Sequence, residues 1–302
     1  MRETDKLPAA KAQELLKKVR KIEFGTRAIV NQILSGAYHS VFKGQGVEFI
    51  DVREYQRGDD IRTVDWNITA RTGYLHVRRY QEERERTVML VIDVSQSISF
   101  GSQNQSKAEL AAELAALLAF SAVSNNDRVG LLLFSDRRER YIPPQKGPKH
   151  VLRMLTEILN CRPTSSRTDL NCALEFLGKA TKRNSIVFLI SDFFSPDFST
   201  TLKIAKRKHD CVALILNDIR EYQLPALGWL SLTDSETGSD IEIDTRDKRA
   251  CQEYLKFARA RAKARYNYFA AQQVDAVDLF TDKSYIPPLI SFFSLRKQRQ
   301  RK

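Results

Sequence analysis

Beyond the first third of the chain, short apolar runs alternate with segments whose apolar residues recur at helical spacing. The runs are nearly continuous and rich in Val, Ile and Leu, which is typical of parallel strands covered by helices on both faces. Four runs predict strands: TVMLVIDV (87–94), RVGLLLFS (128–135), SIVFLISD (185–192) and CVALILND (211–218).

The segments between these runs predict crossover helices: KAELAAELAALLAFSAVS, GPKHVLRMLTEIL, DLNCALEFLGKATK and FSTTLKIAKRK. Farther along, WLSLTDSETGSDIEIDT predicts a hairpin, residues 246–272 a long basic helix, and VDAVDLFT a last strand. Such alternation predicts the α/β class, with a doubly wound, mostly parallel sheet.

The first 86 residues have a different texture. A helix is predicted over 9–35, and a segment dense in Arg and Asp with aromatic residues at intervals follows it. The aromatic residues offer apolar anchors, so we expect a folded segment whose Arg–Asp pairs attach it to the sheet. The predicted organisation is an N-terminal accessory region (1–86), a main domain (87–294) and a basic tail (295–302).

Composition narrows the possible classes of protein. The 302 residues are enough for a sizeable core, and much of the net charge of +12 lies in the C-terminal tail, which we expect to be solvated. No segment is apolar enough to span a bilayer, and the N-terminus lacks a signal-peptide core, which predicts a cytoplasmic protein. The four cysteines lack the paired spacing of a zinc site.

Oxygen-bearing side chains gather at the predicted strand ends. Asp93, Ser95 and Ser97 follow the first strand, Asp192 ends the third, and Thr168 begins a predicted helix. Ligands of open parallel sheets bind at the carboxyl ends of the strands, and an all-oxygen donor set suits Mg²⁺, Ca²⁺ or Mn²⁺. Two carboxylates leave such a cation short of ligands, so a partner's acidic side chain could complete the shell. Alternatively, the same residues serve as turn and helix-cap residues.

The motif DVSQS, followed by Thr168 and then Asp192, resembles the metal-ion-dependent adhesion site of von Willebrand factor A domains, whose pattern is DxSxS, a distant Thr and a distant Asp. This resemblance implies a von Willebrand factor A-like main domain. It also implies that Asp93, Ser95, Ser97, Thr168 and Asp192 are the metal ligands.

A second resemblance comes from REYQRGDDIRTVDWNITARTGYLHVRRYQEERE and the upstream GAYHSVFKGQGVEF. Both are similar to the bacterial domain-of-unknown-function family fifty-eight, in which this segment precedes a von Willebrand-type domain. Members are often paired with MoxR-type AAA+ ATPases. The resemblance therefore implies a non-enzymatic adaptor that works with such an ATPase on client proteins.

Two other functions compete with this hypothesis. A haloacid-dehalogenase-type hydrolase needs a second acid where Ser95 stands, and a serine nucleophile needs a histidine base, but the four histidines lie in no recognisable motif. No GxxxxGK[ST] loop is present either. Nucleic-acid binding is favoured by the basic helix and tail, although Tyr254, Phe257, Tyr266, Tyr268 and Phe269 predict that the helix buries an aromatic stripe.

Overall fold

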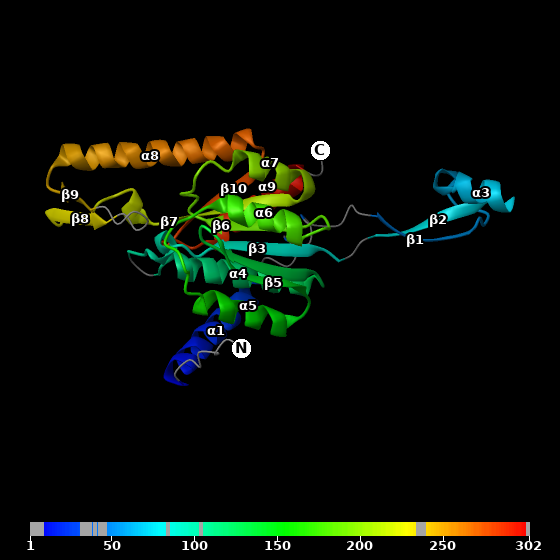
Figure 1. The fold of residues 1–302 in the computed structure, drawn as a ribbon, viewed down its shortest axis with the longest axis horizontal. Helices are drawn as coiled ribbons and strands as arrows, with labels where there is room; N and C mark the ends of the chain where they lie inside the picture. Colours follow the sequence, from blue (N-terminus) through cyan, green and yellow to red (C-terminus); the bar gives the residue numbers. More distant parts are fainter. Residues whose placement is uncertain are drawn as a thin grey trace. The chain divides into compact units, whose positions relative to one another are not determined.

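The computed structural model describes residues 9–30, 38, 41, 47–82, 85–102, 105–233 and 240–299. The chain forms two compact units (Figure 1): a smaller one of Phe42–Arg86, and a larger one of Met1–Val41 with Thr87–Lys302. Among the described helices, none combines the length and the apolar character needed to cross a bilayer.

A six-stranded sheet forms the centre of the larger unit, with strand order β10-β7-β6-β3-β4-β5. Five of its strands run parallel, and only β5 is antiparallel to its neighbour. The strands are β3 (Thr87–Asp93), β4 (Arg128–Phe134), β5 (Arg138–Gln145), β6 (Ile186–Ser191), β7 (Asp210–Asn217) and β10 (Asp275–Phe280). The predicted α/β class and mostly parallel sheet are therefore confirmed.

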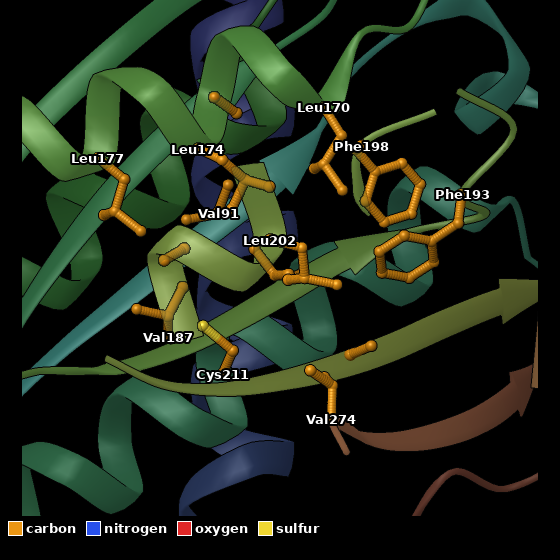
Figure 2. Close-up of a cluster of buried hydrophobic side chains, with 14 of the residues drawn as sticks. Val91, Leu170, Leu174, Leu177, Val187, Phe193, Phe198, Leu202, Cys211 and Val274 are labelled. Atoms are coloured by element: carbon orange, nitrogen blue, oxygen red, sulfur yellow. The ribbon is translucent and has the colours of Figure 1, made fainter. Parts of the chain in front are cut away.

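Helices cover both faces of this sheet, as the continuous apolar strands require. The helices of the larger unit are α1 (Ala9–Ile29), α4 (Lys107–Ser124), α5 (Pro148–Asn160), α6 (Leu170–Ala180), α7 (Ser199–Lys208), α8 (Lys248–Ala271) and α9 (Ile286–Arg299), of which α1 packs on α4 and α5. On one face, α6 and α7 bury apolar side chains against Val91 and Val187 (Figure 2). Phe269 of α8 belongs to the same buried cluster. Because side chains alternate along a strand, Leu90 and Ile92 face the opposite side, and α4 packs against β3 and β4.

The edge strand β5 was not predicted from the sequence. Its residues Pro143 and Pro144 cannot donate ladder hydrogen bonds, so prolines in sheets are confined largely to edges. The strand pairs only with β4 in the described part of the sheet, and its exposed and buried residues partly alternate, unlike those of the central strands.

The predicted basic tail is wrong in part. Leu295–Arg299 is the last part of α9, and Arg296 forms ion pairs with Asp210 and with Asp275, at 3.3 Å for the latter. Arg299 also pairs with Asp275, at 2.8 Å. These ion pairs join the last turn of α9 to the first residues of β7 and β10. Residues 300–302 lie outside the described part of the chain.

The predicted accessory region 1–86 is divided between the two units. Helix α1 packs against α4 and α5, so it belongs to the larger unit, whereas the smaller unit starts at Phe42. Amphipathic helices have no sequence mark for the surface that they cover, so the sequence alone does not show that the first helix packs on α4 and α5. Of the predicted helix 9–35, residues 31–35 lie outside the described residues.

The smaller unit contains an antiparallel pair, β1 (Val47–Glu54) and β2 (His76–Glu82), a short turn η2 (Ile61–Thr63) and helix α3 (Trp66–Thr72). Asp65 accepts hydrogen bonds from the first backbone N–H groups of α3 and pairs with Arg78 at 2.8 Å. Arg53 pairs with Asp59 at 2.7 Å. These pairs hold the unit's own elements together, and their predicted role in attaching the segment to the main sheet stays a prediction.

The predicted hairpin is present as β8 (Trp229–Thr233) and β9 (Asp240–Asp244), an antiparallel pair whose connection lies outside the described residues. Helix α8 starts directly after Asp247, whose side chain caps it. The predicted basic helix and hairpin are thus confirmed.

Candidate metal centre

Two buried carboxylates lie at the carboxyl edge of the sheet. Asp93 is the last residue of β3, Asp192 follows the last residue of β6, and these strands are parallel neighbours. Both side chains are fully buried. The position matches the place where parallel sheets bind ligands.

The loop after β3 brings two hydroxyls to this edge. The Ser95 N–H donates to Asp93 Oδ1 at 2.9 Å, so the chain folds back beside the carboxylate. The Ser95 and Ser97 hydroxyl oxygens are 3.1 Å apart, and both residues are buried. The alternating motif therefore directs both serines into one volume, as predicted.

Thr168 lies in the loop before α6, next to the serine loop. The Gln96 N–H donates to the Ser166 carbonyl at 3.3 Å, and the Asp169 N–H donates to the Ser135 carbonyl at 3.0 Å. Thr168 itself is buried. These backbone hydrogen bonds join the loops after β3, β4 and α5 at the same edge of the sheet. The serine loop and the loop that contains Thr168 are about 70 residues apart in the sequence.

The two aspartates repel each other. Burial raises the pKa of Asp93 to about 7, and the neighbouring charge of Asp192 adds to this effect. The Ser191 hydroxyl donates to Asp93 Oδ2 at 2.7 Å and opposes the rise only in part. Two buried carboxylates that raise each other's cost of ionisation favour the presence of a cation.

A lysine that the sequence analysis missed lies at this site. Lys107, the first residue of α4, is 1% exposed, and its Nζ donates to Asp192 Oδ2 at 3.1 Å and to Glu221 Oε1. Burial alone would lower the pKa of Lys107, but the charges of Asp192 and Glu221 outweigh it and raise the pKa. A Lys at the start of an apolar helix has no sequence mark that distinguishes it from an exposed one.

Helix α8 also reaches the site. Arg265 donates to the Asp192 carbonyl at 2.8 Å and to Asn217 Oδ1 at 2.6 Å. The Phe194 N–H donates to Asp192 Oδ1 at 3.1 Å, and the Arg261 guanidinium lies 4.1 Å from the centre of the Phe194 ring. The backbone and side chain of Asp192 are therefore fixed from several elements at once.

The outer face of α8 differs from the prediction. Phe269 is fully buried, as expected for an aromatic stripe, but Phe257 and Tyr266 are 66% and 62% exposed. Helical spacing alone could not tell which aromatic residues of α8 meet the core. The prediction of a fully buried stripe is wrong for these two residues.

The donor set of this edge fits a hard divalent cation. Carboxylate and hydroxyl oxygens suit Mg²⁺, Ca²⁺ or Mn²⁺. Within the part of the chain that the structure describes, no group of three or more His, Cys, Asp and Glu side chains could hold a metal. A cation at this edge would therefore depend on the serines and threonine, and the Lys107 ammonium already shows that positive charge is accommodated beside Asp192.

The histidines lie elsewhere. His150 Nε2 contacts the Val129 carbonyl at 2.9 Å, His76 is on β2, and His209 directly follows α7. His39 lies outside the described residues. The hydrogen bonds described for Ser95 and Ser97 join these serines to Asp93 and to each other, and none of them involves a histidine.

Comparison with known proteins finds one relative that matches along most of its length and another that matches over a part. The uncharacterized protein Rv1480 of Mycobacterium tuberculosis is 29% identical over 290 residues, which cover 93% of this chain and 89% of that protein. YeaD of Bacillus subtilis is 24% identical over 146 residues, 48% of this chain and 34% of YeaD.

Two solved structures are similar at lower identity. BatB from Bacteroides thetaiotaomicron is 15% identical with a TM-score of 0.46, and the match covers 70% of this chain and 99% of BatB. The SpRpn10 VWA domain is 10% identical with a TM-score of 0.38, and the match covers 68% of this chain and 93% of that domain. The fold class itself rests on the strand order and helix packing described above.

The family model described as "Protein of unknown function DUF58" matches residues 51–264, which include the Arg- and Asp-rich segment, the serine loop, Thr168 and Asp192. The chain therefore belongs to the DUF58 family.

Proposed function

We propose that the protein is a metal-dependent protein-binding adaptor without enzymatic activity. The observation that carries this proposal is the convergence of Asp93, Asp192 and the Ser95–Ser97 hydroxyl pair in one buried edge of the sheet. Ser95, Ser97 and Thr168 would hold Mg²⁺, or Ca²⁺ or Mn²⁺, through their hydroxyls, and Asp93 and Asp192 would act directly or through water.

The bound cation would supply positive charge with an open coordination position, which a carboxylate of the partner fills. The protein's own residues prepare this contact. The Ser95 N–H orients Asp93, and Lys107, Arg265 and the Phe194 N–H fix Asp192. The exposed Arg261 beside Phe194 adds positive charge that suits an acidic partner.

The family suggests the kind of partner. The resemblance to family fifty-eight described above, together with the DUF58 match, supports pairing with a MoxR-type AAA+ ATPase in remodelling or maturation of client proteins, in the cytoplasm. In this proposal the ATPase supplies the energy, because the chain carries no GxxxxGK[ST] loop.

A pull-down experiment tests the proposal. The tagged protein is incubated with a lysate of its source cells in Mg²⁺ or in EDTA, beside the double variant Asp93→Ala, Ser95→Ala and the control Thr156→Ala on α5. We expect a partner that is retained by wild type and control in Mg²⁺, lost in EDTA, and lost by the double variant, whose melting curve should show a folded domain. Equal retention by the double variant in both buffers would refute the proposal.

Nucleic-acid binding remains the second candidate because the basic helix α8 exposes Phe257 and Tyr266, which could stack on bases. Its mark would be an affinity for single-stranded RNA or DNA that falls steeply with salt and is independent of EDTA. Replacement of Phe257 and Tyr266 by Ala would abolish such binding and leave the metal-dependent pull-down unchanged.

A further inference from the structure

The buried Lys107 needs a physical explanation. An ammonium group removed from water is costly unless it is paired, and Lys107 is paired with two carboxylates, Asp192 and Glu221. One of these, Asp192, belongs to the candidate metal centre. Lys107 therefore neutralises part of the negative charge that the cation would use.

The charges of the site can be counted from its contacts. Asp93, Asp192 and Glu221 contribute three negative charges when ionised and Lys107 one positive charge. Arg265, which donates to the Asp192 carbonyl, is itself paired with Asp278 at 3.4 Å, so these two charges offset each other and two negative charges are left at the edge. One divalent cation would balance them. Without Lys107 the same site would be more negative and would attract a cation more strongly.

The geometry places Lys107 and the cation on the same carboxylate. Lys107 Nζ donates a hydrogen bond to Asp192 Oδ2, and the Phe194 N–H donates one to Asp192 Oδ1. A cation that binds Asp192 must share this carboxylate with the Lys107 ammonium group. The two positive charges then lie close together in a buried site, where their repulsion is strong.

We propose that Lys107 is a built-in cation of the site, which holds Asp192 in place when no metal is bound and sets the affinity for divalent cations to a low value. This inference rests on the proposed function. In this proposal Lys107 lowers the affinity for the cation and Glu221 opposes that effect, because Glu221 shares the Lys107 ammonium group with Asp192.

The proposal predicts that substitutions of Lys107 and of Glu221, which are in contact, change the affinity for a divalent cation in opposite directions. Lys107→Met removes the positive charge and keeps a side chain of similar length. It should tighten Mn²⁺ binding by about tenfold or more, because the repulsion between the buried ammonium and the cation is removed. Glu221→Gln removes a negative charge with little change in shape and should weaken Mn²⁺ binding by about tenfold. If Lys107 only positioned Asp192, Lys107→Met would weaken binding instead.

The experiment is titration calorimetry of the full chain with MnCl₂ at pH 8, with circular dichroism of each variant and Glu175→Gln, an exposed carboxylate on α6, as control. Tighter binding by Lys107→Met and weaker binding by Glu221→Gln support the proposal. Unchanged or weaker binding by a folded Lys107→Met overturns it, as does unchanged or tighter binding by Glu221→Gln, which serves alone if Lys107→Met does not fold.

The outcomes separate this inference from the proposed function. If wild type binds Mn²⁺ and the two variants do not shift in the stated directions, only the role of Lys107 falls. If neither wild type nor Lys107→Met binds Mn²⁺, both the metal centre and the role of Lys107 are refuted.

Discussion

At the scale of single residues, burial decides what the ionisable groups at the strand ends can do. Asp93, Asp192 and Lys107 have carboxylate and ammonium groups like many on the surface, but all three are removed from water. Their charges therefore act on one another at short range instead of being screened. That is why the cation is proposed at this edge of the sheet and not at one of the many exposed acidic positions in the chain.

His209 allows a test of burial elsewhere in the larger unit. It lies at the end of α7, is almost fully buried, and neither ring nitrogen has a hydrogen-bond partner among the described residues. Burial lowers the pKa of His209, and the charge of Lys208 adds to the effect.

The folded protein disfavours the charged imidazole. At a pH above the unfolded-state pKa of about 6.5, His209 is neutral in both states and does not lower the free energy of unfolding. Stability is then lost as the pH falls toward the lower folded pKa. We expect His209→Leu to lose less unfolding free energy than wild type between pH 7.5 and pH 5.5, as measured by urea unfolding. A loss equal to that of wild type would show that His209 does not titrate on unfolding in this range.

At the scale of elements, the pairing of β4 with the edge strand β5 depends on a close approach. A Cβ at Gly130 of β4 would lie 2.7 Å from Met89 Sδ, 3.0 Å from Pro144 Cγ and 3.1 Å from the Ile142 carbonyl oxygen. A glycine is thus needed here for packing, since its backbone angle is not of the left-handed type.

We expect Gly130→Ala to lower the free energy of unfolding by about 1–3 kcal/mol, because the added methyl group overpacks the space between β3 and β5. Gly178→Ala is the matched control: a Cβ there meets nothing within 4 Å, and it lies inside α6. It should stabilise the protein by about 0.5–1 kcal/mol. Urea unfolding of both variants gives the comparison, and equal effects would contradict the packing argument.

At the scale of the whole molecule, the chain consists of two units with separate supports. The larger unit is supported by the apolar core between the sheet and its helices, while the smaller unit is supported by ion pairs and a helix cap within Phe42–Arg86. Local stability can differ between such units.

Asp65 tests this independence. It caps α3 and pairs with Arg78, whose hydrogen bond lowers the pKa of Asp65. Asp65→Ala should speed amide hydrogen exchange in α3, β1 and β2, because a cap is worth about 1 kcal/mol and the ion pair is lost too. Exchange in β3 and β6, and Mn²⁺ binding, should not change. Faster exchange throughout the larger unit would show that the units unfold together.

Much of the fold could be predicted from local pattern. The four apolar runs became β3, β4, β6 and β7, because a strand covered on both faces needs apolar residues at every position. The weaker predictions failed where context decides: Pro143 and Pro144 hid an edge strand, and the basic residues of α9 proved to be paired with Asp210 and Asp275.

The sequence by itself determined the parallel sheet and the oxygen-bearing residues at its strand ends, since apolar continuity and the DVSQS spacing are local properties of the chain. Only the tertiary structure decided that Lys107 and Glu221 lie beside Asp192, because they come from α4 and from the turn after β7, 85 and 29 residues away in the sequence. Contacts between distant segments depend on how the helices pack, and no local pattern encodes that packing.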